Sequence, residues 1–220
     1  VNVNATFLKN KVVELPMEPY KSSMYFIMPG HSRYEFWLRQ WAGVNPETGY
    51  NLYVADIDNP DYEWEENELI YKGDVAYTED VEHAKYDWSG DAMPVVTGGF
   101  GTNLSWKNWD LNVMFYYQLG GKYYDSTYAS LMSTGSGSLS FSKLHVDLLN
   151  RWKQPGDITD IPRHGIFTEF DSRLLEDASF LRLKNILQGV IVFAGVEHAG
   201  NHQQMMTQIM PVDRGLLFDH

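Results

Sequence analysis

The chain has 220 residues, of which 44% are hydrophobic and 15% aromatic, and it contains 18 glycines and no cysteine. A formal net charge of -12 argues against a nucleic-acid partner, since an acidic chain repels phosphates. The lack of cysteine excludes disulfides and thiolate metal sites, and no run of 18 apolar residues predicts a transmembrane helix.

Three short stretches in the first quarter of the chain carry strand patterns. Residues 1–8 alternate Val, Asn, Val, Asn and predict a strand, and residues 34–41 predict a second strand of mixed polarity. Asn45-Pro-Glu-Thr-Gly49 has the composition of a tight turn, after which residues 50–54 run back as a third strand. The chain starts at Val1 without a leader, so we expect a fragment or a processed product.

Acidic residues are concentrated between positions 55 and 93, which contain thirteen Asp and Glu but only two Lys, Lys72 and Lys85, and no Arg. We interpret this stretch as a long solvated loop that its charge keeps soluble. A cation site is the alternative, although no Asp-x-Asp-x-Asp-Gly spacing accompanies it.

Residues 95–120 predict one β-hairpin with a two-residue turn at Lys107 and Asn108. In the first arm Phe100, Leu104 and Trp106 share a face, and in the second arm so do Trp109, Leu111, Val113, Phe115 and Tyr117. Each arm is about ten residues long, the length with which a tilted strand crosses a bilayer, and the two tryptophans suit an interfacial aromatic girdle.

A second long connection follows from residue 121 to residue 176. It contains a flexible Gly/Ser stretch at 134–138 and a short helix predicted over 142–152, with Ser142 as N-cap. Residues 178–187 alternate again and predict another strand, with Leu181, Leu183, Asn185 and Leu187 on one face. Short turns thus alternate with long connections, as in outer-membrane barrels, whereas a soluble sandwich usually has shorter connections at both ends.

Several segments in order resemble the SusC/RagA family of TonB-linked outer-membrane transporters. The resemblance covers residues 1 to about 188 and rests on Asn4–Val12, Gly30-His31-Ser32, Ala42–Pro46, Pro94–Trp109, Gln118–Gly121, Arg151-Trp152, Ile161-Pro162-Arg163 and Leu175–Asn185. Residues 189–220 do not resemble the family, and we expect an altered or truncated tail there.

The resemblance implies an all-β fold: part of a large, incomplete antiparallel transmembrane β-barrel with one short helix in a long outer loop. It also implies import of glycan or peptide fragments across a Gram-negative, Bacteroidetes-like outer membrane. The implied partners are a SusD-like surface lipoprotein, outer-membrane lipid, and TonB, which would be reached through a region before residue 1. The alternative is a soluble or surface-attached carbohydrate-binding β-sandwich.

Recognisable catalytic chemistry is sparse, and we predict no enzyme, cofactor or metal site. His198 and His202 lack a third ligand, Gly98-Gly-Phe-Gly101 lacks phosphate-loop spacing, and the acids at 171 and 176–177 lack a nucleophile motif. Aromatic rings in the long connections remain as candidates for stacking on a sugar or gripping a peptide. These candidate substrate contacts are Tyr62, Trp64, Tyr86, Trp88, Tyr123 and Tyr124.

Overall fold

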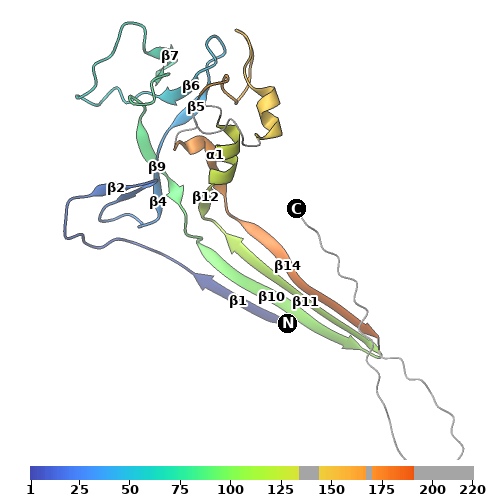
Figure 1. The fold of residues 1–220 in the computed structure, drawn as a ribbon. Helices are drawn as coiled ribbons and strands as arrows, with labels where there is room; N and C mark the ends of the chain where they lie inside the picture. The colour runs from blue at the N-terminus through green and yellow to red at the C-terminus, as the bar shows by residue number, and fades with distance from the viewer. Residues whose placement is uncertain (134–143, 167–169, 191–220) are drawn as a thin grey trace, which may run out of the picture. The chain divides into compact units, whose positions relative to one another are not determined.

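The computed structural model describes residues 1–133, 144–166 and 170–190 (Figure 1). The chain divides into two compact units. Unit 1 comprises residues 1–7, 95–119 and the C-terminal part from 179, and unit 2 comprises residues 8–94 and 120–178. Within the described ranges, no helix is long and apolar enough to cross a membrane.

Unit 1 is one antiparallel sheet with the strand order β1-β10-β11-β14. Its strands are β1 (Asn2–Phe7), β10 (Val96–Trp106), β11 (Trp109–Leu119) and β14 (Phe180–Val190). The predicted hairpin is confirmed, because β10 and β11 pair along their whole length and Trp106 lies opposite Trp109. Lys107 makes the turn in the left-handed region, with φ of 54°.

The two faces of this sheet differ in polarity. Cross-strand pairs on one face are Val3 with Phe100, Phe100 with Phe115, Leu104 with Leu111, Val113 with Ile186 and Phe115 with Leu183. Large apolar side chains on this face stay open, with Leu181 63% and Ile186 60% exposed. The opposite face carries asparagines, and the Asn185 amide donates to Asn112 at 3.2 Å. A sheet whose apolar face is uncovered requires an apolar surrounding.

Strand β14 contains a bulge that the alternation did not predict. The register shifts between Met114 and Phe115, so that Met114 pairs with Asn185 and Phe115 pairs with Leu183. Lys184 is the extra residue, and a bulge reverses the side on which later residues fall. Ile186 therefore joins Leu181 and Leu183, and the predicted grouping of Asn185 and Leu187 with them was wrong.

Long connections leave the unit 1 sheet at a single end. Phe7 lies opposite Val96, and Val96 lies opposite Leu119. The ends of β1 and β11 therefore lie at the same end of the sheet as the start of β10. Gln118 pairs with Phe180, which puts the start of β14 at the same end. The opposite end carries the turn at Lys107. One end with long connections and one with a tight turn is the arrangement of outer-membrane barrels.

Unit 2 is built from short strands in three small antiparallel sheets. One has the order β2-β3-β4-β9, with β2 (Tyr20–Ser22), β3 (Tyr25–Ile27), β4 (Glu35–Arg39) and β9 (Tyr86–Asp91). Another has the order β5-β6-β8-β7, with β5 (Trp41–Val44), β6 (Asn51–Val54), β8 (Val75–Thr78) and β7 (Ile70–Lys72). β12 (Lys122–Tyr124) pairs with β13 (Leu175–Asp177). The buried side chains include Phe36, Leu38, Leu52, Tyr53 and Ala84.

The strand predictions for these segments were correct only in part. Residues 34–41 contain β4 and the first residue of β5, and the predicted turn at 45–49 joins β5 to β6, which covers most of residues 50–54. The acidic stretch 55–93, predicted as a loop, contains β7, β8 and β9.

Among the residues that the structure describes, one short α-helix occurs, upstream of the predicted place. It is α1 (Ser126–Met132), whose first turn is capped by the Asp125 side chain accepting from the Tyr128 backbone N–H at 2.8 Å. The predicted range 142–152 holds a 3-10 helix, Val146–Asn150, that begins after His145. The proposed cap Ser142 lies outside the described residues, as do His198 and His202.

Candidate functional site

The six candidate aromatic residues all lie in unit 2, but they fall into three groups instead of one site. Tyr62 and Trp64 lie in the acidic segment, which we define as residues 57–68. Tyr86 and Trp88 lie on β9, and Tyr123 and Tyr124 lie on β12.

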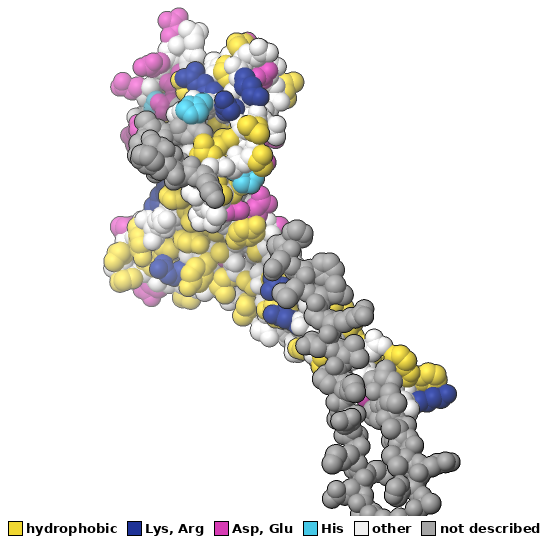
Figure 2. Space-filling view, turned by 45° about the vertical axis from the view of Figure 1, so that its right-hand side comes forward, with side chains coloured by type: hydrophobic (Ala, Val, Ile, Leu, Met, Phe, Trp, Pro, Cys, Tyr) yellow, Lys and Arg dark blue, Asp and Glu magenta, His cyan; other side chains and the backbone are white. Residues whose placement is uncertain are grey.

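An acidic hollow of about 510 Å³ lies beside the first group. Its lining includes five carboxylates and one imidazole, from Glu63, Glu65, Glu68, Glu79, Asp80 and His83. Acidic side chains are concentrated at the upper left of the space-filling view (Figure 2). A hollow with this lining favours cationic groups over anionic ones.

His83 is the centre of this group. Its Nδ1 lies 2.6 Å from Glu68 Oε1 and 3.8 Å from Asp80 Oδ2. Its ring also packs against Tyr62 and Trp64, with centroids 4.7 and 4.9 Å away. His83 was not among the predicted site residues, because only the fold brings residue 83 next to residues 62–68.

Titration of the two partners is coupled by this contact. The hydrogen bond to Glu68 raises the pKa of His83, and the negative charges of Glu68, Asp80 and Glu82 add to that effect. Burial alone would raise the pKa of Glu68, but hydrogen bonds from His83, the Glu65 backbone and Thr78 outweigh it and lower the pKa. Protonated His83 and ionised Glu68 are thus the favoured pair.

Glu68, Asp80 and His83 also meet the simplest condition for a metal site, since their potential ligand atoms lie within 4.8 Å of one another. The separation of 2.6 Å between His83 and Glu68 is a hydrogen-bond distance. Two ligands on one tetrahedral ion lie about 3.3 to 3.6 Å apart, given metal–ligand bonds of about 2.0 to 2.2 Å. We therefore interpret the contact between His83 and Glu68 in this structure as an ion pair.

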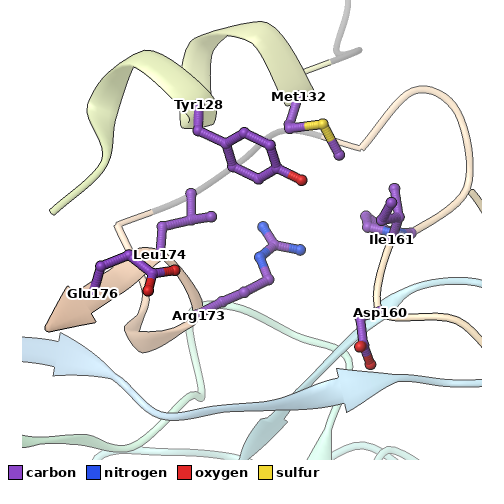
Figure 3. Close-up of a pocket in the computed structure, with 8 residues that line it drawn as sticks. Tyr128, Met132, Asp160, Ile161, Arg173, Leu174 and Glu176 are labelled. Atoms are coloured by element: carbon purple, nitrogen blue, oxygen red, sulfur yellow. The ribbon is translucent and has the colours of Figure 1, made fainter. Parts of the chain in front are cut away.

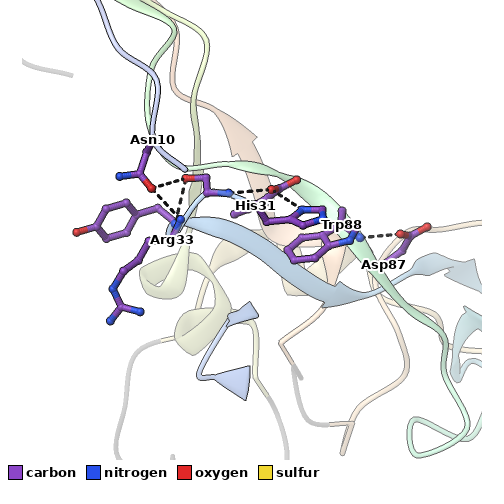
Figure 4. A network of polar contacts seen from close by, with 8 residues as sticks. Asn10, His31, Arg33, Asp87 and Trp88 are labelled. Carbon is purple, nitrogen blue, oxygen red and sulfur yellow. Dashed lines mark hydrogen bonds and ion pairs between the residues drawn. The ribbon is translucent and has the colours of Figure 1, made fainter. Parts of the chain in front are cut away.

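Tyr86 and Trp88 belong to an aromatic cluster across β3, β4 and β9. Trp88 meets Trp37 edge-on at 4.8 Å between centroids, and His31 stacks on Trp88 at 3.8 Å with 9° between the planes. Figure 4 shows the His31 ring lying flat against Trp88, while its Nδ1 lies 3.0 Å from Glu35. Tyr86 stacks with Trp37 and lies under the Lys21 ammonium at 3.9 Å. Much of the surface of these rings is therefore covered by neighbouring rings.

The same cluster is tied to residues near the start of unit 2. Asn10 accepts a hydrogen bond from the Arg33 backbone at 2.9 Å and from the Ser32 hydroxyl at 3.4 Å (Figure 4). Ser32 and Glu35 then close the turn that carries His31, since the Ser32 backbone donates to Glu35 at 3.4 Å. The sequence Gly30-His31-Ser32, quoted above for its resemblance, thus positions a ring against Trp88.

Tyr123 and Tyr124 alternate along β12 and differ in exposure. Tyr123 is 48% exposed, whereas Tyr124 packs against Phe170 at 5.7 Å between centroids. Of the six candidates, Tyr123 has the most accessible ring, because the others are half-buried or packed against neighbouring rings.

A small pocket of about 150 Å³ lies between α1 and the 3-10 helix at Ser172–Leu174. Its lining is mainly apolar, from Met132, Ile161, Pro162 and Leu174, with Tyr128, Arg173, Asp160 and Glu176 as polar members. The Arg173 guanidinium points toward the Tyr128 ring from across the pocket (Figure 3). None of these residues is among the six candidate substrate contacts, because residues 128, 160 and 173 are distant in sequence. Glu176 was considered from sequence only as a possible hydrolase acid.

Polar groups around this pocket are held by the protein itself. Arg173 donates to Asn51 at 3.1 Å and lies 3.7 Å from Asp171, which is fully buried and also accepts from the Tyr53 hydroxyl at 3.4 Å. Burial, together with the hydrogen bond to Asp147, raises the pKa of Tyr128 to about 12. Asp171 thus stabilises the packing around this pocket.

Glycines of the run 98–101 lie in the β10 strand, as the barrel interpretation requires. A Cβ on Gly98 would lie 2.2 Å from the Asn4 carbonyl oxygen and 2.6 Å from the Tyr117 hydroxyl. The Gly99 backbone N–H donates to the Asn4 side chain at 2.7 Å. These glycines permit close approach of β1 and of Tyr117, which is a structural role.

Comparison with known proteins points to one family. No family model matches the chain. TonB-dependent receptor P3 of Formosa agariphila is 35% identical over 101 residues, which are 46% of this chain and 10% of that protein.

Solved structures extend the similarity to most of the chain. The match to the structure of the RagAB peptide transporter covers 88% of this chain and 21% of the chain in that structure, with a TM-score of 0.70 and 24% sequence identity. The match to the RagAB peptide importer in its 'closed-closed' state covers 89% of this chain and 21% of the chain in that structure, with a TM-score of 0.68 and 25% sequence identity. The chain spans about a tenth of the curated relative and about a fifth of these structures. With the two-faced sheet of unit 1, these matches support a fragment of a SusC/RagA-like TonB-dependent receptor that has the fold of part of an outer-membrane barrel.

Proposed function

We propose that the receptor to which this chain belongs imports peptide or glycan fragments across the outer membrane, with TonB as energy source. The observation that carries the proposal is the sheet of β1, β10, β11 and β14, with its exposed apolar face and its polar opposite face. The relatives support the class of activity, since one is named a TonB-dependent receptor and others a peptide transporter.

A SusD-like surface lipoprotein is the proposed partner, and the family resemblance suggests it as a lid. The boundary near residue 188 is also part of the proposal, with the late barrel strands and their connections before it and a different tail, 189–220, after it. Mass spectrometry of the C-terminal peptide of the native gene product tests this boundary. Detection of a family-like C-terminus in place of residues 189–220 is the expected result, and an intact 189–220 peptide would contradict it.

Substrate contact is proposed for Tyr62, Trp64, Tyr86, Trp88, Tyr123 and Tyr124. Their exposure ranks them, because a ring that stacks on a ligand must have an open face. Tyr123, with the open ring, is the strongest candidate, whereas Tyr86 and Trp88 are the weakest because Trp37 and His31 stack on them. Tyr62 and Trp64 sit beside the acidic hollow, which favours a cationic ligand such as a basic peptide.

Uptake by the source bacterium tests the proposal. Deletion of the full-length gene should abolish uptake of one labelled pool, either mixed peptides or mixed oligosaccharides, and complementation should restore it. Within the complemented strain, Tyr123→Ala should reduce uptake more than Tyr86→Ala. Unchanged uptake of both pools after deletion would contradict the transport proposal.

A further inference from the structure

The acidic segment, residues 57–68, makes few hydrogen bonds with the remainder of unit 2. Among the described residues, the hydrogen bonds of positions 57–67 stay within residues 56–68, for example Tyr62 N–H to Asn59 and Asp61 N–H to the Asn59 side chain. Only Glu68 reaches further, to His83 and to the Thr78 hydroxyl at 3.3 Å. The position of the segment therefore depends on few hydrogen bonds.

His83 contacts this segment in two ways, through an ion pair and through ring packing. Its Nδ1 pairs with Glu68 at 2.6 Å, and its ring packs against Tyr62 and Trp64. The backbone at His83 is itself fixed, since its carbonyl accepts from Asp56 N–H at 3.1 Å and the neighbouring Ala84 is buried and bridges to Ala55. A fixed imidazole thus meets a segment that has few other attachments.

We propose that protonated His83 fastens the acidic segment to unit 2, and that the segment loosens when His83 loses its proton. The charged groups that line the hollow or act on the His83 ring are all acidic, and neither Lys nor Arg lines the hollow. They are Glu63, Glu65 and Glu68 from the segment, and Glu79, Asp80 and Glu82 from the turn after β8. An imidazolium offsets their mutual repulsion and interacts favourably with the aromatic faces. A neutral imidazole keeps at most one hydrogen bond to Glu68 and leaves the repulsion uncompensated.

The pH window follows from the two shifts. The raised pKa of His83 means that its contribution is full below the ordinary imidazole value near 6.5 and is lost as pH rises through the raised value. The lowered pKa of Glu68 means that its contribution is present above about 4.5 and is lost as pH falls through the lowered value. The segment is held most firmly in mildly acidic solution.

Hydrogen exchange measured by mass spectrometry on the full-length receptor tests this proposal. Spectra are compared at about pH 5.5 and about pH 9, on either side of the imidazole titration, after correction for intrinsic exchange rates. Protection of residues 57–68 should fall by about two- to fivefold at the higher pH, the factor expected for a partly exposed ion pair. Equal protection at both pH values would overturn the proposal.

Two variants separate His83 from a general effect of pH. His83→Gln should abolish the pH dependence within residues 57–68. His31→Gln, which removes the imidazole paired with Glu35 elsewhere in unit 2, should leave that dependence intact. A pH effect that persists in His83→Gln would overturn the proposal even if wild-type protection changes. If His83→Gln does not fold, Glu68→Gln removes the same ion pair and should likewise flatten the pH response.

Discussion

Phe100 and Phe115 stack across the central strand pair of unit 1, with ring centroids 5.0 Å apart and 20° between their planes. A cross-strand aromatic pair contributes about 0.5 to 1.5 kcal/mol beyond its buried area. The pair lies on the same face of the sheet as Val113, Leu104 and Leu183. The predictions for unit 1 depend on that assignment.

Val113→Arg in the full-length receptor should reduce the free energy of unfolding in membranes by about 2 to 4 kcal/mol, the cost of a charge on the lipid face at mid-depth. Met114→Arg is the matched control, because Met114 points to the opposite face and pairs with Asn185. Denaturant unfolding in lipid vesicles measures both. Equal stability of the two variants would count against a lipid-facing Val113.

Gly98→Val should impair pairing of β1 with β10, because a side chain there meets the Asn4 carbonyl and the Tyr117 hydroxyl. Overpacking of this kind costs about 1 to 3 kcal/mol. Gly189→Ala is the control, since its added Cβ would find its nearest neighbour 3.9 Å away. The fraction of receptor that migrates as a folded barrel without heating should drop for the first variant and not for the second.

Gly49→Ala should destabilise unit 2 more than Gly73→Ala. Both glycines have positive φ, 77° and 64°, so both substitutions carry the left-handed backbone cost of about 1 to 2 kcal/mol. Only at Gly49 would the new Cβ also lie 2.5 Å from the Trp152 ring, which is anchored by its Nε1 donating to Pro46 at 2.8 Å. The rate of proteolysis within residues 120–178 should therefore rise further in Gly49→Ala, and equal rates would contradict this packing.

Tyr128→Phe should remove one phenol whose pKa is higher than that of an ordinary tyrosine. Burial and the hydrogen bond to Asp147 raise the pKa of Tyr128 to about 12, so the folded state retains this proton beyond the ordinary value of 10.0. The stability contributed by the phenol is full below pH 10.0 and declines as pH rises toward about 12. Ultraviolet difference titration of wild type against Tyr128→Phe should show the missing transition near the upper value; a difference centred at 10.0 would refute the contact.

The unit 1 hairpin was predictable because the sequence features that determine it lie close together in the chain. Alternation over residues 96–119 fixes both faces, and one residue with positive φ, Lys107, suffices for the turn. The bulge at Lys184 was not predictable, because it depends on how β14 meets Met114 and Phe115 of another strand.

Unit 2 was largely unpredictable for the opposite reason. Its strands have only three to six residues, too few for periodicity to reveal, and distant contacts hold them in place. Arg173 binds Asn51 and Trp152 binds Pro46, across 122 and 106 positions of sequence. Candidate aromatic residues could be named from composition, but the packing of His83 and His31 against them could not be predicted.

Spin labelling of the unit 1 sheet tests the central claim most directly. Single cysteines at positions 113 and 114 of the full-length receptor, in lipid vesicles, would each carry a nitroxide, and this chain has no cysteine of its own to interfere. A label at 113 should be relaxed mainly by oxygen, which concentrates in lipid, and a label at 114 by a water-soluble nickel complex. The same collision pattern at both positions, or the reverse pattern, would contradict a membrane-spanning sheet with Val113 toward lipid.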